Sequence, residues 1–172
     1  GGIIMIKEEN KDAFLKVIET NKGIIYKVSR AYCYHDEDRK DLIQEIIIQL
    51  WNSFSKYNDQ YQLSTWIYRI AINVAISFYR KNSVRNNMTT QLTSAVNFID
   101  DSHTKELEDD IALLYRFIHE LNSLDKALML FYLEQKTYKE IADILDISET
   151  NVATRIGRVK KVIKQKFLAI NK

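Results

Sequence analysis

Residues 137–156 read TYKEIADILDISETNVATRI, which is two short amphipathic segments joined by a tight turn. Thr137 is followed three residues later by Glu140, the pattern of a capping box, so a helix is expected to begin there. Ser148 can cap a second helix through its hydroxyl. Small Ala142 lets the two helices approach each other, and apolar side chains fill the angle between them. The stretch therefore predicts a helix-turn-helix.

The turn contains Asp146, where such motifs usually have glycine because the residue needs a positive φ. Aspartate is one of the residues that tolerate a left-handed backbone best. We therefore keep the helix-turn-helix assignment and expect a positive φ at Asp146.

The second helix of this motif has short polar side chains near its start and cations further along. From Glu149 onward the chain has seven basic residues and one acidic residue. This order suits a helix in the major groove of DNA, with polar groups at base edges and the later cations near phosphates. The alternative is a plain helical hairpin with a solvated charged face. The candidate DNA contacts are Thr150, Asn151, Ala153, Thr154, Arg155 and Arg158.

The composition of the whole chain indicates an all-α protein. Its 172 residues include no proline and four glycines, and chains so poor in helix-interrupting residues are mostly helical. The single cysteine, Cys33, excludes an internal disulfide and favours a reducing cytoplasm. No apolar run approaches the roughly 18 residues that a membrane span needs. We expect a cytoplasmic protein that does not insert into a membrane.

A polar stretch divides the chain into two halves. Between Ser83 and Thr104, 10 of the 22 residues are serine, threonine or asparagine, and no apolar period persists. A structureless stretch of this length inside one compact domain would be unusual. We therefore expect two small helical domains, 8–82 and 105–170, joined by a flexible linker at 83–104.

Apolar spacing predicts where the helices lie. In the first half they are expected at 11–20, 23–34, 36–56 and 64–82, and in the second half at 106–121, 125–134, 137–145 and from 149 onward. The first two are separated near Gly23. The candidate caps are Asp36 or Asp38 for the third helix and Ser64 or Thr65 for the fourth.

The helix expected at 36–56 has a second face beside its core stripe. That face carries Asp41, Gln44, Glu45 and Ile48 at spacings of three and four. An aliphatic side chain among polar ones can mark a partner surface. A lone exposed aliphatic residue is the equally simple alternative.

The helix expected at 64–82 combines cations, an amide and aromatic rings. Rings can stack on unpaired bases, arginines can hold phosphates, and asparagine can read a base edge. The alternative is that Trp66, like Trp51, belongs to the core of a small bundle. The candidate residues are Tyr61, Trp66, Arg69, Asn73 and Arg80.

Catalytic patterns are absent from the sequence. The three histidines have no metal-spaced partners, and there is no phosphate-binding glycine loop or nucleophile elbow. The acidic run after His35 is explained by the preference of a helix start for anions. We expect a protein without catalytic residues, cofactor, metal or small-molecule substrate.

Two blocks of the chain resemble bacterial sigma factors. The run DLIQE at 41–45 and the run LSTWIYRIAIN at 63–73 resemble region two of that family. The stretch 121–161, which includes TYKEIA and VATRIGR, resembles region four. The two blocks in this order, with a polar tether between them, are similar to the extracytoplasmic-function (ECF) group.

The resemblance implies a role for each candidate surface. Asp41, Gln44, Glu45 and Ile48 would bind the largest subunit of core RNA polymerase. The loop from Tyr57 to Thr65, with Trp66, Arg69 and Asn73, would engage the minus-ten promoter element and capture a flipped base. The helix after Ser148 would lie at the minus-thirty-five element. Ala153 and Gly157 are small where many relatives have larger contact residues, so phosphate contacts and DNA shape would carry more of the recognition.

The resemblance also implies an anti-sigma factor that hides these surfaces until a signal arrives. Two other functions are compatible with the same residues. A stand-alone helix-turn-helix regulator would need a dimer and paired half-sites. An adaptor would keep the fold but sequester another protein.

Overall fold

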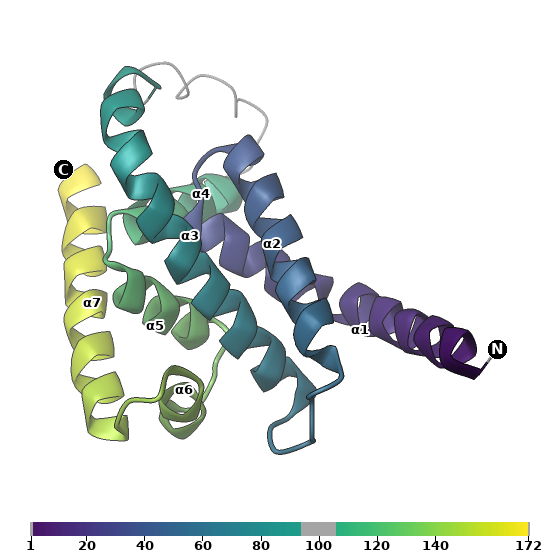
Figure 1. Ribbon diagram of the computed structural model, residues 1–172. Coiled ribbons are helices and arrows are strands. Elements are labelled where there is room, and N and C mark those ends of the chain that lie inside the picture. Colours follow the sequence, from purple (N-terminus) through teal and green to yellow (C-terminus); the bar gives the residue numbers. More distant parts are fainter. Residues whose placement is uncertain (1, 94–105, 172) are drawn as a thin grey trace.

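The computed structural model describes residues 2–93 and 106–171, and every regular element in these two ranges is a helix. This confirms the predicted all-α class. Figure 1 shows α1, α2 and α3 side by side, with α5 and α6 against the other side of α3, α7 packed on α5 and α6, and the first turns of α1 projecting from the body. The helices are α1 (Gly2–Tyr32), α2 (Asp36–Phe54), α3 (Leu63–Thr93), α4 (Glu106–His119), α5 (Ser123–Leu133), α6 (Tyr138–Leu145) and α7 (Glu149–Ile170).

The core of the first half comes from one stripe on each of three helices. On α2 the fully buried residues are Leu42, Ile46 and Leu50, spaced by four along a single face. Ile67 and Ala71 of α3 are buried against them. Because this stripe faces inward, the opposite face of α2 is left for solvent.

The first helix is continuous, so the prediction of two helices separated near Gly23 is wrong. The polar side chains at the expected break bond to their own helix: Thr20 Oγ1 donates to the Lys16 carbonyl at 2.8 Å, and Asn21 Nδ2 donates to the Val17 carbonyl at 2.9 Å. A glycine inside a helix costs about 1 kcal/mol. Burial of Phe14 and Ile25 on either side offsets that cost.

The end of α3 also differs from the prediction. The helix continues to Thr93 rather than ending near Asn82, so the first part of the segment predicted as a linker is helical, and 94–104 lie outside the described residues. Polar residues such as serine and asparagine cost at most about 0.7 kcal/mol each in a helix. Without proline or glycine in 83–93, nothing forces the helix to stop.

The predicted caps of the second and third helices are wrong. His35 occupies the N-cap position of α2 and makes no side-chain cap bond, while the acidic residues fill the first turn. Helix α3 begins at Leu63, so Ser64 and Thr65 lie inside its first turn. The acids of α2 act through the helix dipole instead of through a cap bond.

The helix-turn-helix forms as predicted. Thr137 Oγ1 accepts from the Glu140 N–H at 3.1 Å, and Glu140 Oε2 accepts from the Thr137 N–H at 2.9 Å, which completes the capping box. Asp146 has a φ of 56°. The Ser148 hydroxyl accepts from the Asn151 N–H at 3.1 Å and caps α7.

The two halves pack against each other along one seam. Tyr32 of α1 donates its hydroxyl hydrogen to the Ser123 carbonyl at 2.6 Å, and the rings of Tyr68 and Phe131 meet edge to face at 4.9 Å. Lys27 and Glu134 form an ion pair at 2.7 Å. The structure therefore shows the halves closed on each other.

Lys126 of α5 is the one lysine buried in the described ranges, with 1% of its surface exposed. Its ammonium lies 4.1 Å from the ring centre of Tyr79 and 5.5 Å from that of Tyr32. Among the described residues it forms no ion pair with a carboxylate. Burial lowers the pKa of Lys126 to about 8. The seam thus encloses a charge that aromatic faces stabilise only in part.

We predict that His119, at the end of α4, makes the stability of the folded chain sensitive to acid. Burial and the charge of Lys126 lower the pKa of His119 to about 4, although a hydrogen bond to the Arg30 backbone opposes the shift. Since the unfolded state binds the proton first, His119 should remove up to about 3 kcal/mol of stability as the pH falls from 6.5 to 4. Urea unfolding of His119→Gln should be less pH-dependent in this window than that of the wild type. Equal pH dependence of the two chains would contradict this assignment.

None of the helices in the described ranges is long and apolar enough to cross a membrane.

Candidate polymerase and nucleic-acid interfaces

The outer face of α2 is open to solvent. Asp41, Gln44 and Glu45 are exposed, and Ile48 exposes 50% of its surface. Helix α2 packs on α1 and α3, on the side away from the helix-turn-helix (Figure 1). We call Asp41, Gln44, Glu45 and Ile48 the α2 face. A half-exposed isoleucine among polar side chains suits a surface that a partner covers.

Trp51 extends the α2 face by one turn. It lies three residues beyond Ile48 and is 42% exposed, and its ring meets that of Phe14 edge to face with the ring centres 5.1 Å apart. From the sequence it was expected in the core. The helical spacing of three residues from Ile48 is the sequence signal that could have placed Trp51 beside this face.

Aromatic and cationic residues gather where the 55–62 loop enters α3. The ring centres of Tyr57 and Trp66 are 5.1 Å apart, and the Tyr57 hydroxyl donates to the Tyr61 carbonyl at 2.8 Å. The Arg69 guanidinium lies over the Tyr61 ring at 4.8 Å. Trp66 is partly buried, so it serves both the packing and the surface. We call Tyr57, Tyr61, Trp66 and Arg69 the α3 cluster.

The remaining two candidates on α3 lie further along the helix. Asn73 is one turn beyond Arg69, and Arg80 lies about two turns beyond Asn73. Both are exposed. The spacings of four and seven place all three residues on one face, which could follow a strand of nucleic acid.

The α3 cluster touches the helix-turn-helix. Arg69 Nη1 donates to the Asp143 carbonyl of α6 at 3.4 Å. In the closed arrangement, one candidate DNA-binding residue is therefore occupied by the other half of the chain.

Helix α7 presents the remaining candidates. Its buried residues Val152, Ile156 and Val159 face α5 and α6, which leaves the other side of the helix to solvent. The exposed candidates are Thr150, Asn151, Ala153, Thr154 and Arg158. Arg155 differs, because it is partly buried and its side chain is held within the protein.

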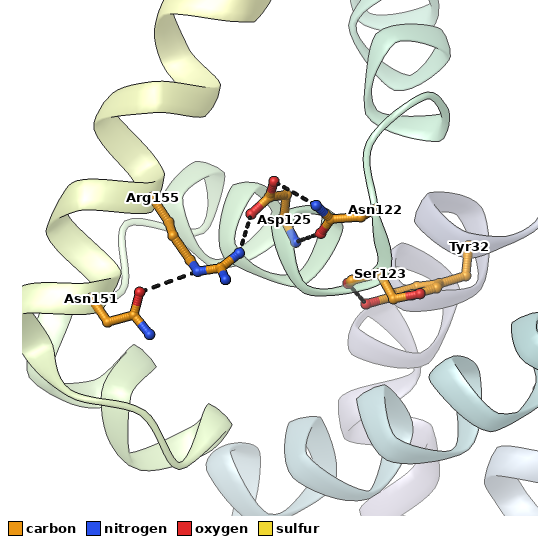
Figure 2. Close-up of polar contacts among 6 residues, drawn as sticks. All are labelled: Tyr32, Asn122, Ser123, Asp125, Asn151 and Arg155. Atoms are coloured by element: carbon orange, nitrogen blue, oxygen red, sulfur yellow. Dashed lines mark hydrogen bonds and ion pairs between the residues drawn. The ribbon is translucent and has the colours of Figure 1, made fainter.

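Figure 2 shows Arg155 lying between Asn151 and Asp125. Its Nε donates to Asn151 Oδ1 at 3.1 Å, and its Nη1 donates to Asp125 Oδ1 at 3.3 Å. Asp125 was not among the residues predicted from the sequence. It lies 30 positions from Arg155, and only the packing of α5 on α7 brings the two together.

Comparison with known proteins identifies the family. Residues 17–85 match the family model of sigma-70 region 2, and residues 111–163 match that of sigma-70 region 4, which together is more than half of the chain. The ECF RNA polymerase sigma factor SigW of Bacillus subtilis is 24% identical, over 96% of this chain and 94% of that protein. The chain belongs to the sigma-70 family, in its ECF group. The α2 face and the α3 cluster of this sigma factor lie in the region 2 match, and the helix-turn-helix lies in the region 4 match.

Solved structures share the fold of this sigma factor. CnrH in complex with the cytosolic domain of CnrY has a TM-score of 0.67 and 16% identity, over 92% of this chain and 90% of that one. The sigma factor RpoE of Bartonella quintana, in complex with the anti-sigma factor NepR, has a TM-score of 0.62 and 17% identity, over 96% and 99% of the two chains. The family-model matches confirm the predicted family, and its members are transcription factors rather than enzymes.

Proposed function

We propose that this sigma factor binds core RNA polymerase through the α2 face and directs it to promoters with two further surfaces. Residues 8–82 would form the polymerase-binding and minus-ten domain, and residues 105–170 the minus-thirty-five domain. The observation that carries the proposal is the α2 face itself, where Ile48 is half exposed on a helix whose opposite stripe is fully buried. The chain would act in the cytoplasm and have no catalytic activity of its own.

The α3 cluster suits the capture of an unpaired base. Extruding a base costs a few kcal/mol, and stacking on an aromatic side chain supplies about 1–3 kcal/mol. The paired rings of Tyr57 and Trp66 offer such a platform, with Arg69 close by for a phosphate. Asn73 and Arg80 would extend this contact along the strand.

Helix α7 would lie at the minus-thirty-five element. Thr150, Asn151 and Thr154 can reach base edges, and Arg158 can reach a phosphate. Ala153 is too small for a long polar contact, and Gly157 has no side chain. Phosphate contacts and DNA shape would therefore supply much of the affinity.

Promoter binding requires the two halves to separate. By their names the two elements lie about 25 base pairs apart, which is roughly 85 Å along the duplex. In the closed chain Arg69 touches the backbone of Asp143 in the helix-turn-helix. The two surfaces therefore cannot reach both elements until the seam opens, and we propose that polymerase binding holds it open.

We also propose an anti-sigma partner for this chain. The two solved structures described above were obtained with CnrY and with the anti-sigma factor NepR. A partner that covers the α2 face would exclude polymerase from Ile48. Such a partner would keep the sigma factor inactive without altering its fold.

Run-off transcription tests the proposed function. The purified chain, added to core RNA polymerase and a library of promoter fragments, should start transcripts at discrete sites, whereas the chain without polymerase should bind the same fragments weakly. Folded protein that yields no transcript from any fragment would contradict the proposal. Tight operator binding by a dimer without polymerase would instead indicate a stand-alone regulator. Unchanged function after Arg155→Ala and Arg158→Ala would indicate an adaptor.

A further inference from the structure

Arg155 and its neighbours have fixed hydrogen-bond roles. Arginine has five N–H donors and no acceptor. Two of these donors are engaged, at Nε with Asn151 Oδ1 and at Nη1 with Asp125 Oδ1. The side chain thus keeps three donors for DNA, and its direction is set before DNA arrives.

Asp125 is itself held in place. Its backbone N–H donates to Asn122 Oδ1 at 2.9 Å, and its Oδ2 accepts from Asn122 Nδ2 at 3.0 Å. These two bonds leave Oδ1 for Arg155 (Figure 2). The Asp125 side chain is 16% exposed and that of Arg155 32%, so water screens this pair less than an ion pair on the open surface.

The arrangement fixes the amide of Asn151 as well. Because Arg155 Nε can only donate, the atom of Asn151 that it meets must be the amide oxygen. This bond engages one of the two lone pairs of Asn151 Oδ1 and fixes the plane of the amide, so the NH₂ group is the part of Asn151 that stays fully available to DNA. Asparagine needs both its oxygen and its NH₂ group to bind adenine in the bidentate manner.

We propose that Asp125 is a positioning residue that makes this part of helix α7 present mainly hydrogen-bond donors to DNA, which selects hydrogen-bond acceptors such as guanine O6 and N7 and disfavours adenine. This inference rests on the proposed function, because it assumes that α7 lies in the major groove at the minus-thirty-five element. Asp125 acts through Arg155 and then Asn151, and it does not itself touch DNA.

Holoenzyme transcription from a library of minus-thirty-five variants tests this inference. Asn151→Ala identifies the base pair that Asn151 faces, as the position whose preference it alters. At that position the wild type should prefer guanine to adenine. In Asp125→Ala the released amide should recover bidentate binding, and the ratio of adenine to guanine transcription should rise by about fivefold or more, which corresponds to at least 1 kcal/mol.

Asp143→Ala is the matched control. It removes an exposed acidic side chain of α6, and the hydrogen bond to Arg69 uses the Asp143 backbone, which the substitution keeps. It should raise DNA affinity for all sequences alike and leave the base preference unchanged. Asp125→Ala in an Arg155→Ala background should also leave the preference as it is in Arg155→Ala alone, because the coupling passes through Arg155.

The outcomes separate this inference from the proposed function. Wild-type protein that gives no transcripts would overturn the proposed function. Wild-type transcripts with an adenine preference at that position, or an Asp125→Ala profile equal to that of the wild type, would overturn the role of Asp125 alone. If Asp125→Ala fails to fold, Arg155→Lys removes the Nε contact while keeping the charge, and it should shift the preference in the same direction.

Discussion

Ile48→Arg is expected to lower the affinity of the chain for core RNA polymerase by at least about 30-fold, and to reduce run-off transcription accordingly. Ile48 lies in the middle of the α2 face with half of its surface exposed in the free chain. Removing a central apolar contact typically costs 2 kcal/mol or more in affinity. On docking, the guanidinium of an arginine at this position would also lose its hydration without an acidic group placed to pair with it. A binding assay with core enzyme measures the effect directly.

The free chain should tolerate this substitution, since exposed sites usually change stability by less than about 0.5 kcal/mol. Ile170→Arg is the matched control, because Ile170 is 54% exposed and lies beyond the region 4 match. It should bind polymerase as the wild type does. Equal polymerase affinity of Ile48→Arg and the wild type would show that the α2 face is not the docking surface.

Lys126→Met is expected to stabilise the closed chain at pH 7 by about 1–3 kcal/mol. The lowering of the Lys126 pKa from 10.5 to about 8 corresponds to a cost of about 3 kcal/mol for burying the charged form. Methionine has a similar shape and removes that cost, but it also loses the attraction of the Tyr79 ring for the ammonium. Urea unfolding of both chains measures the difference.

The pH dependence of this difference identifies its origin. Between pH 8 and 10.5 the unfolded state binds the Lys126 proton more tightly than the folded state, so wild-type stability gains from this group as the pH rises. The advantage of Lys126→Met should therefore shrink across this window. Burial raises the pKa of Cys33 to about 12, and since this affects both chains, only their difference is informative. Lys40→Met, at an exposed site, should be neutral at both ends of the window. A constant difference would contradict the buried charge.

Local hydrogen bonds and periodic burial were readable from the sequence. The capping box of Thr137 and Glu140 and the Ser148 cap join residues three apart, so the chain forms them wherever a helix begins. The stripe of α2 predicted that the α2 face would be exposed, but it wrongly placed Trp51 in the core. The prediction of a break in α1 was wrong because it used Gly23 as a local signal alone. Packing on both sides of Gly23 offsets the cost of a glycine in the helix, so the helix continues.

Contacts between distant segments were not readable in this way. Arg155 meets Asp125 across 30 positions, and Arg69 meets Asp143 across 74. Lys126 follows a serine and an aspartate in a helix start, and nothing local shows that α1 and α3 will cover it. The pattern on α7 therefore predicted a DNA-facing helix, whereas only the fold shows which of its donors are already engaged.

The buried ammonium of Lys126 destabilises the closed arrangement of the two halves relative to an open one. While the two halves are packed together, the Lys126 ammonium is shielded from water, and the folded chain bears the free-energy cost of this lost hydration. If the halves separate as proposed, water would reach Nζ and this cost would be removed. A polymerase that separates the halves would therefore need to supply less free energy than if residue 126 were uncharged.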